Sequence, residues 1–155
     1  MEKEKRTLKF SEIFGFGAGG MFTYGFQLMI TGYYLLYYMT DIAGFSTVLA
    51  ASLYSTIQII KMVTMLFSGV IIDAINFRSG KYRTWVLVSG IGLGLFFPLS
   101  FFYYPLPQSV YVVVFMIIYT LQTLFYNVGW TAMRAVIGKV AKNKADVVAL
   151  NTSAQ

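Results

Sequence analysis

The stretch of sequence that decides the fold is Gly69-Val-Ile-Ile-Asp73-Ala-Ile-Asn-Phe-Arg78-Ser-Gly80-Lys81-Tyr-Arg83. It gathers one acidic and three basic side chains between two long apolar runs, which end near residue 72 and resume at residue 84. Charged side chains are costly inside a lipid bilayer, whereas its surface tolerates them. This arrangement predicts a short charged loop that joins two membrane-spanning helices.

Apolar segments continue on both sides of this loop. The whole sequence is 57% apolar and 12% charged, whereas soluble domains are about 45–50% apolar and about 25% charged. A helix needs about 20 residues to cross the hydrocarbon layer. We therefore expect an all-α membrane protein with four transmembrane helices, at approximately residues 14–39, 47–72, 84–102 and 109–135.

The placement of the cations predicts the orientation. Of the 12 Lys and Arg residues, all except Lys61 lie before residue 14, between residues 78 and 83, or after residue 133. Because cytoplasmic loops retain Lys and Arg, we expect both termini to be cytoplasmic in a multi-pass protein of the cell membrane. The net charge of +6 then follows from topology and contact with the lipid bilayer, and no nucleic-acid partner is expected. Residues 138–155 mix Lys with Val and Leu, which predicts an amphipathic cytoplasmic tail.

The composition also argues against an enzyme. The sequence contains no Cys and no His, which are the usual thiol nucleophile, general base and metal ligands. We therefore expect no catalytic residues, no metal site and no cofactor.

The charged loop resembles a known signature. Its pattern G-x-x-x-D-x-x-x-x-R-x-G-K is similar to the loop between helices 2 and 3 of the major facilitator superfamily. Ser-Gly-Lys-Tyr-Arg-Thr-Trp, ending at Trp85, resembles the glycoside–pentoside–hexuronide:cation symporters, the melibiose-permease-like branch, except that Thr84 stands where proline is usual. Three further runs fit this branch: Phe-Gly-Phe-Gly-Ala at 14–18, Tyr-Tyr-Met-Thr-Asp-Ile-Ala-Gly at 37–44, and Tyr-Thr-Leu-Gln-Thr-Leu-Phe-Tyr at 119–126.

The resemblance implies a carrier that transports glycosides or sugars by alternating access between two halves of six helices each. Residues 1–155 would be part of the N-terminal half, a truncated or fragmentary chain that corresponds to the first helices of the fold. The loop would act as a conformational gate whose contacts form in one state and break in the other. Its residues would be Gly69, Asp73, Arg78, Gly80, Lys81 and Arg83.

One motif argues against sodium coupling. The D-x-x-x-D motif that supplies cation-binding carboxylates in the melibiose-permease-like proteins falls on Lys61 and Met65. An ammonium group has donors and no acceptor, so it cannot bind Na⁺. A proton or no coupling ion is therefore favoured over Na⁺, with Lys61 as a built-in cation. A lysine in mid-membrane must face a wet cavity or a polar partner.

Polar and aromatic residues at helical spacing suggest a sugar site. Sugars need fixed donors and acceptors together with an aromatic plane for their apolar face. A glycoside is expected as the substrate, with an anionic one as an alternative for which Lys61 and Arg134 would be the charge partners. The candidate binding residues are Tyr24, Gln27, Gln58, Lys61, Gln122, Tyr126, Asn127, Trp130 and Arg134.

A different class remains open at this point. A self-contained four-helix protein would be a small multidrug-type transporter or a structural membrane subunit. The first of these would be expected to carry an acidic residue within a helix, and none of the spans has one before Asp73.

Overall fold

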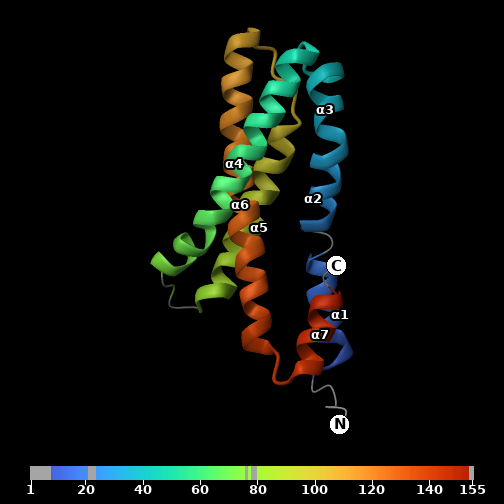
Figure 1. Ribbon diagram of the computed structural model, residues 1–155, viewed down its shortest axis with the longest axis vertical. Coiled ribbons are helices and arrows are strands. Elements are labelled where there is room, and N and C mark those ends of the chain that lie inside the picture. Colours follow the sequence, from blue (N-terminus) through green and yellow to red (C-terminus); the bar gives the residue numbers. More distant parts are fainter. Residues whose placement is uncertain (1–7, 21–23, 76, 78–79, 154–155) are drawn as a thin grey trace.

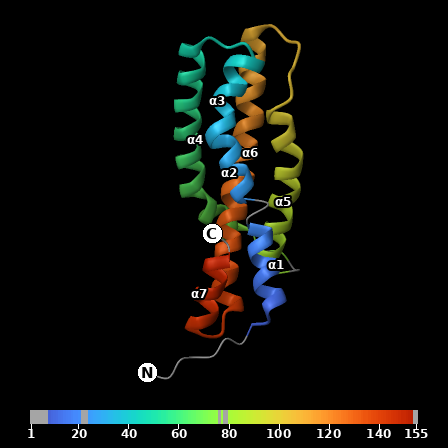
Figure 2. The ribbon, with the colours of Figure 1, turned by 90° about the vertical axis from the view of Figure 1, so that its right-hand side faces the viewer.

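The computed structural model describes residues 8–20, 24–75, 77 and 80–153. This part of the chain is helical and contains no strand. Three long helices stand side by side, and a segmented helical stretch lies along them (Figures 1 and 2). The elements are α1 (Phe10–Gly20), α2 (Phe26–Met29), η2 (Ile30–Tyr34), α3 (Leu35–Tyr37), η3 (Tyr38–Ile42), α4 (Thr47–Ala74), α5 (Lys81–Ser100), α6 (Gln108–Val140) and α7 (Lys144–Ser153), where η marks a π-helical segment.

The three long helices confirm three of the expected spans. Within the described residues, α4, α5 and α6 are long and apolar enough to cross a membrane. The side chain of Ser46 caps α4 by accepting a hydrogen bond from the backbone N–H of Leu49. Gly80, with φ of 99°, precedes α5 in a conformation that favours glycine. Pro107 precedes α6, which continues to Val140 and so includes the expected start of the cytoplasmic tail.

The first span differs from the expected single helix over residues 14–39. α1 ends at Gly20, and from Phe26 to Ile42 the backbone alternates between α and π turns. The hydroxyls of Thr31 and Thr40 donate to the carbonyls of Gln27 and Leu36, at 2.9 and 3.1 Å. Such bonds compete with the regular helical pattern, and the many glycines of this region lower its helix propensity. The described part of the first span is therefore segmented rather than uniformly α-helical, and a membrane crossing here stays a prediction.

Helix α6 is the centre of the packing. Both α4 and α5 lie along it, and close approach depends on two glycines. A Cβ atom at Gly92 would overlap the ring of Phe125, and one at Gly129 would overlap the hydroxyl of Tyr24. At the end of the bundle near η3, Tyr38 and Tyr111 share a hydrogen bond of 2.7 Å between their hydroxyls. The bundle is thus held by close helix contacts and buried aromatic rings.

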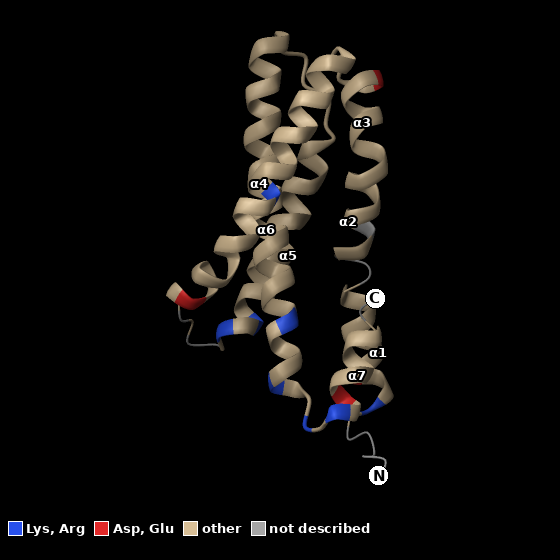
Figure 3. Cartoon of the chain, viewed as in Figure 1, with Lys and Arg blue, Asp and Glu red and all other residues tan. Residues whose placement is uncertain are grey.

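The end of the chain packs against its beginning. Helix α7 lies beside α1 (Figure 2), and Gly17 of α1 has no side chain where Ser153 approaches it. Asp146 is buried, and its carboxylate accepts hydrogen bonds from the backbone N–H groups of Leu8 and Lys142, each at 3.3 Å. Apart from Lys61, the described cations gather at this end of the bundle (Figure 3).

Candidate functional site

A small polar recess lies between the segmented stretch, α4 and α6. Its volume of about 10 Å³ admits about one water molecule. Every side chain around it carries a polar group, although the helices that form it are predominantly apolar. The lining residues are Gln27, Thr31, Lys61, Tyr119, Thr123 and Tyr126.

Lys61 supplies the charge of this recess. It is half-buried in the middle of α4, and its Nζ atom lies 5.6 Å from the centroid of the Tyr126 ring. The carboxylate of Asp73 pairs with Lys81 at the end of α4, and no described carboxylate forms an ion pair with Lys61. The ring and the recess therefore provide the polar surroundings that a lysine at this depth requires.

Asn127 of α6 forms hydrogen bonds with α4 next to Lys61. Its amide nitrogen donates to the carbonyl oxygen of Lys61 at 3.0 Å and to the hydroxyl of Thr64 at 2.6 Å. One turn away, the hydroxyls of Ser68 and Thr131 are 2.8 Å apart. The polar stripes of α4 and α6 thus meet each other, and Asn127 positions the lysine instead of facing the recess.

An aromatic cluster continues from the recess along α6. The ring of Tyr24 is 5.6 Å from that of Tyr126 and 5.5 Å from that of Trp130. The guanidinium of Arg134 lies 4.5 Å above the ring of Trp130. Tyr24 is buried, so the half-buried rings of Tyr126 and Trp130 form the accessible part of this cluster, with the Arg134 cation at one end. Aromatic planes of this kind suit the apolar face of a sugar ring.

Two candidate residues lie away from the recess. Gln58 is exposed on α4. Gln122 is buried toward α5, where its side-chain oxygen accepts a hydrogen bond of 2.7 Å from Ser100. The four-residue steps from Gln122 to Arg134 drift by about 40° each around a helix, so they do not stay on one face.

Sequence reasoning missed three lining residues: Thr31, Tyr119 and Thr123. A usable signal was present, because Thr31 follows Gln27 by four residues and Tyr119, Thr123 and Tyr126 recur at steps of four and three. Met65, at the second expected carboxylate position, is 58% exposed and does not line the recess.

The charged loop has one ion pair in place. The ammonium of Lys81 lies 2.6 Å from the carboxylate of Asp73, across the turn from α4 to α5. Gly80 makes the turn with its positive φ, Gly69 lies one helical turn before Asp73, and Arg83 is exposed. Arg78 lies outside the described residues.

Comparisons with known proteins agree with this arrangement. The family model for MFS/sugar transport proteins matches residues 15–154. In Escherichia coli (strain K12), a glycoside/cation symporter named YagG is 29% identical over 126 residues, which cover 79% of this chain and 27% of that protein. A glucuronide carrier protein homolog is 28% identical over 61% of this chain and 20% of its own length. An inner membrane symporter, YicJ, is 26% identical over 67% of this chain and 23% of its own length.

The chain therefore spans about a quarter of the length of the curated relatives it matches. No solved structure matches it. Its apolar helices and its symporter relatives place it in the cell membrane. Since the family model covers nearly the whole sequence, the chain belongs to the family of MFS/sugar transport proteins.

Proposed function

We propose that this chain is the first part of the N-terminal half of a carrier that moves a sugar or glycoside across the cell membrane by alternating access. The observation that carries the proposal is the polar recess with its adjoining aromatic cluster, placed between otherwise apolar helices. The hydroxyl and amide groups that line the recess are the kind that bind sugar hydroxyls, and Trp130 offers an aromatic plane. Alternating access requires the helices to move apart, which would widen the recess from its present size of about one water molecule. The gate residues of the charged loop would support the change between states.

We further propose that Lys61 takes the place of a coupling sodium ion. Lys61 lines the recess with its Nζ atom beside the Tyr126 ring, and Met65 supplies no carboxylate there. Transport would then depend on a proton or on no ion. The unneutralised charge of Lys61 also favours an anionic glycoside as one alternative substrate, with Arg134 as a second charge partner. A self-contained multidrug-type transporter or structural subunit has no observation in its favour, since the relatives are named as symporters and a carrier.

The proposal is tested by sugar uptake with changes at Trp130. We expect cells that express the complete carrier to take up at least one radiolabelled glycoside saturably. Trp130→Ala should reduce the initial rate at least about tenfold because it removes the plane on which the sugar rests, while Trp130→Phe keeps a plane and should retain more activity. Exposed Phe102, outside the aromatic cluster, provides the control Phe102→Ala. Equal uptake by wild type and Trp130→Ala, or no uptake of any neutral or anionic glycoside, would contradict the proposal.

The topology we propose has four crossings, the first made by the segmented stretch, with both termini cytoplasmic. The chain has no native Cys, so single cysteines can be labelled without background. A cysteine at exposed Lys142 should react with an impermeant maleimide only from the cytoplasmic side, and one at exposed Gln108 only from outside. The reverse labelling pattern would refute the orientation derived from the cations.

A further inference from the structure

A second cavity shares no lining residue with the polar recess. It is a groove of about 550 Å³ between α1, α5 and α6, within the range of about 300–1,000 Å³ that binds small organic ligands. Its walls are apolar, and it begins at the end of the bundle where the cations gather. Residues that define it are Gly15 and Gly19 of α1, Arg83 and Gly90 of α5, and Met133 and Val140 of α6.

Absent side chains keep this groove open. A Cβ atom added at Gly15, Gly19 or Gly90 would have no atom within 4 Å, other than the adjacent residues and the nearby backbone of its own helix. These glycines therefore border unfilled space, in contrast to Gly92 and Gly129, which admit a neighbouring side chain. The groove is a place where the helices leave room for a chain-like apolar group.

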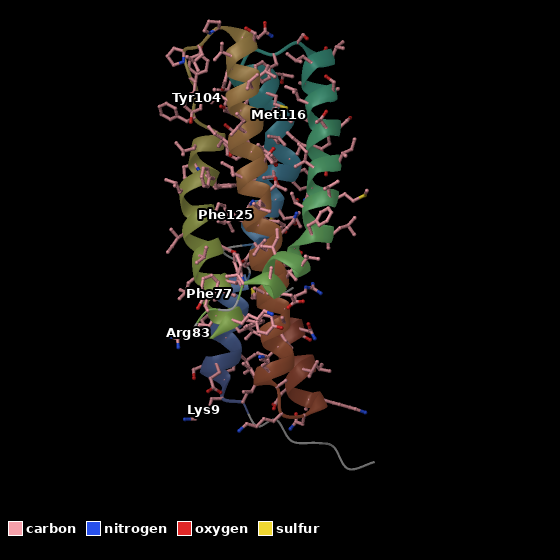
Figure 4. All side chains as sticks on the ribbon, turned by 90° about the vertical axis from the view of Figure 1, so that its left-hand side faces the viewer. Lys9, Phe77, Arg83, Tyr104, Met116 and Phe125 are labelled. Atoms are coloured by element: carbon pink, nitrogen blue, oxygen red, sulfur yellow. The ribbon has the colours of Figure 1, made fainter. Side chains whose placement is uncertain are left out.

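One cation stands at the surface end of the groove. Arg83 lines it in the first turn of α5, and Figure 4 shows Arg83 at the same end of the molecule as Lys9. Arg83 is exposed and forms no ion pair with a described residue. Its guanidinium can bind the oxygens of a phosphate in a bidentate manner. A single charge at the mouth and apolar walls toward the bilayer interior match an amphiphile with an anionic head.

We propose that this groove binds an anionic membrane phospholipid, with its phosphate at Arg83 and an acyl chain along α1, α5 and α6. Basic pockets between membrane helices have this kind of ligand chemistry. Tyr24 borders both this groove and the aromatic cluster, whereas Lys61, Tyr126 and Trp130 do not line the groove, so the proposed lipid site adjoins the proposed sugar site but has its own cation.

The test uses the complete carrier, purified into nanodiscs that contain equal amounts of phosphatidylglycerol and phosphatidylcholine. After mild detergent extraction, the copies of each lipid that remain bound are counted by native mass spectrometry. We expect phosphatidylglycerol to be enriched on the wild-type chain. Arg83→Gln should lower its retention about fivefold, the contribution of one cation near an anionic surface. Gly90→Leu should lower the retention of phosphatidylglycerol to a similar degree with all charges intact, because it fills the groove.

Two control variants distinguish lipid binding in the groove from non-specific attraction of anionic lipid to the cations at this end of the bundle. Lys139 lies at the same end, but its ammonium faces the Tyr82 ring at 4.9 Å, and Gly94 borders open space without lining the groove. Lys139→Gln and Gly94→Leu should retain phosphatidylglycerol as the wild type does. Equal helical content by circular dichroism shows that a variant has folded. Unchanged retention in folded Gly90→Leu, or an equal loss in Lys139→Gln, would overturn the proposal. So would a photo-crosslinker at Leu87 that captures polypeptide instead of lipid.

Discussion

Lys61→Ala is expected to abolish sugar uptake by the complete carrier. The ammonium is the charged group of the recess, and no described carboxylate offsets it, so its removal leaves five polar side chains around an uncharged gap. If Lys61 replaces a coupling ion, the variant lacks the charge that organises these groups. We expect the initial rate of uptake to fall at least about a hundredfold, which is about 2.7 kcal/mol of lost stabilisation.

Controls separate this effect from misfolding. Met62 follows Lys61 in α4 and is 63% exposed, so Met62→Ala should transport normally. Lys61→Arg keeps the charge in a larger group and should retain part of the activity. Surface labelling must show equal amounts of each variant in the membrane. Undiminished uptake by Lys61→Ala would reduce Lys61 to a solvated lysine without a role in transport.

Gly129→Ala is expected to destabilise the bundle and impair uptake together. A Cβ at Gly129 would overlap the Tyr24 hydroxyl and would come within 2.6 Å of the Cβ of Ser89. Tyr24 is 2% exposed and packed between the rings of Tyr126 and Trp130, so it has little room to withdraw. Overpacking of this kind costs about 1–3 kcal/mol. We expect a lower thermal unfolding midpoint and at least about a tenfold loss of uptake.

Gly138→Ala provides the comparison on the same helix. Nothing lies within 4 Å of a Cβ added there, so this change should be neutral or stabilise the helix by up to about 1 kcal/mol. Equal unfolding midpoints for the two alanine variants would show that the Tyr24 contact does not constrain α6.

The sequence predicted the three long helices well because their signals were strong and local. Apolar runs bounded by the Asp73 to Arg83 charges and by the prolines at 105 and 107 placed α4, α5 and α6 within about five residues at each end. The first segment was harder, because glycines and the Thr31 and Thr40 hydroxyls interrupt the regular backbone without changing the hydropathy. Composition cannot show where a π turn replaces an α turn.

Only part of the candidate site could be predicted from the sequence, because its geometry depends on contacts between helices. Periodicity identifies which residues share a helix face but does not show which neighbour that face meets. Lys61 and Tyr126 lie together as expected. In contrast, Gln122 accepts a hydrogen bond from Ser100 of α5, and Asn127 donates one to the α4 backbone. Those outcomes depend on how α4 and α5 pack against α6, which no single stretch of sequence encodes.

The sodium dependence of uptake tests the central claim most directly. Initial rates of glycoside uptake by the unmodified carrier are measured at fixed pH in sodium buffer and again with choline in place of Na⁺. Because Lys61 lines the recess as its charged group and Met65 lies outside it, the two rates should be equal. A strong requirement for Na⁺ would contradict the account in which Lys61 supplies the positive charge of the site.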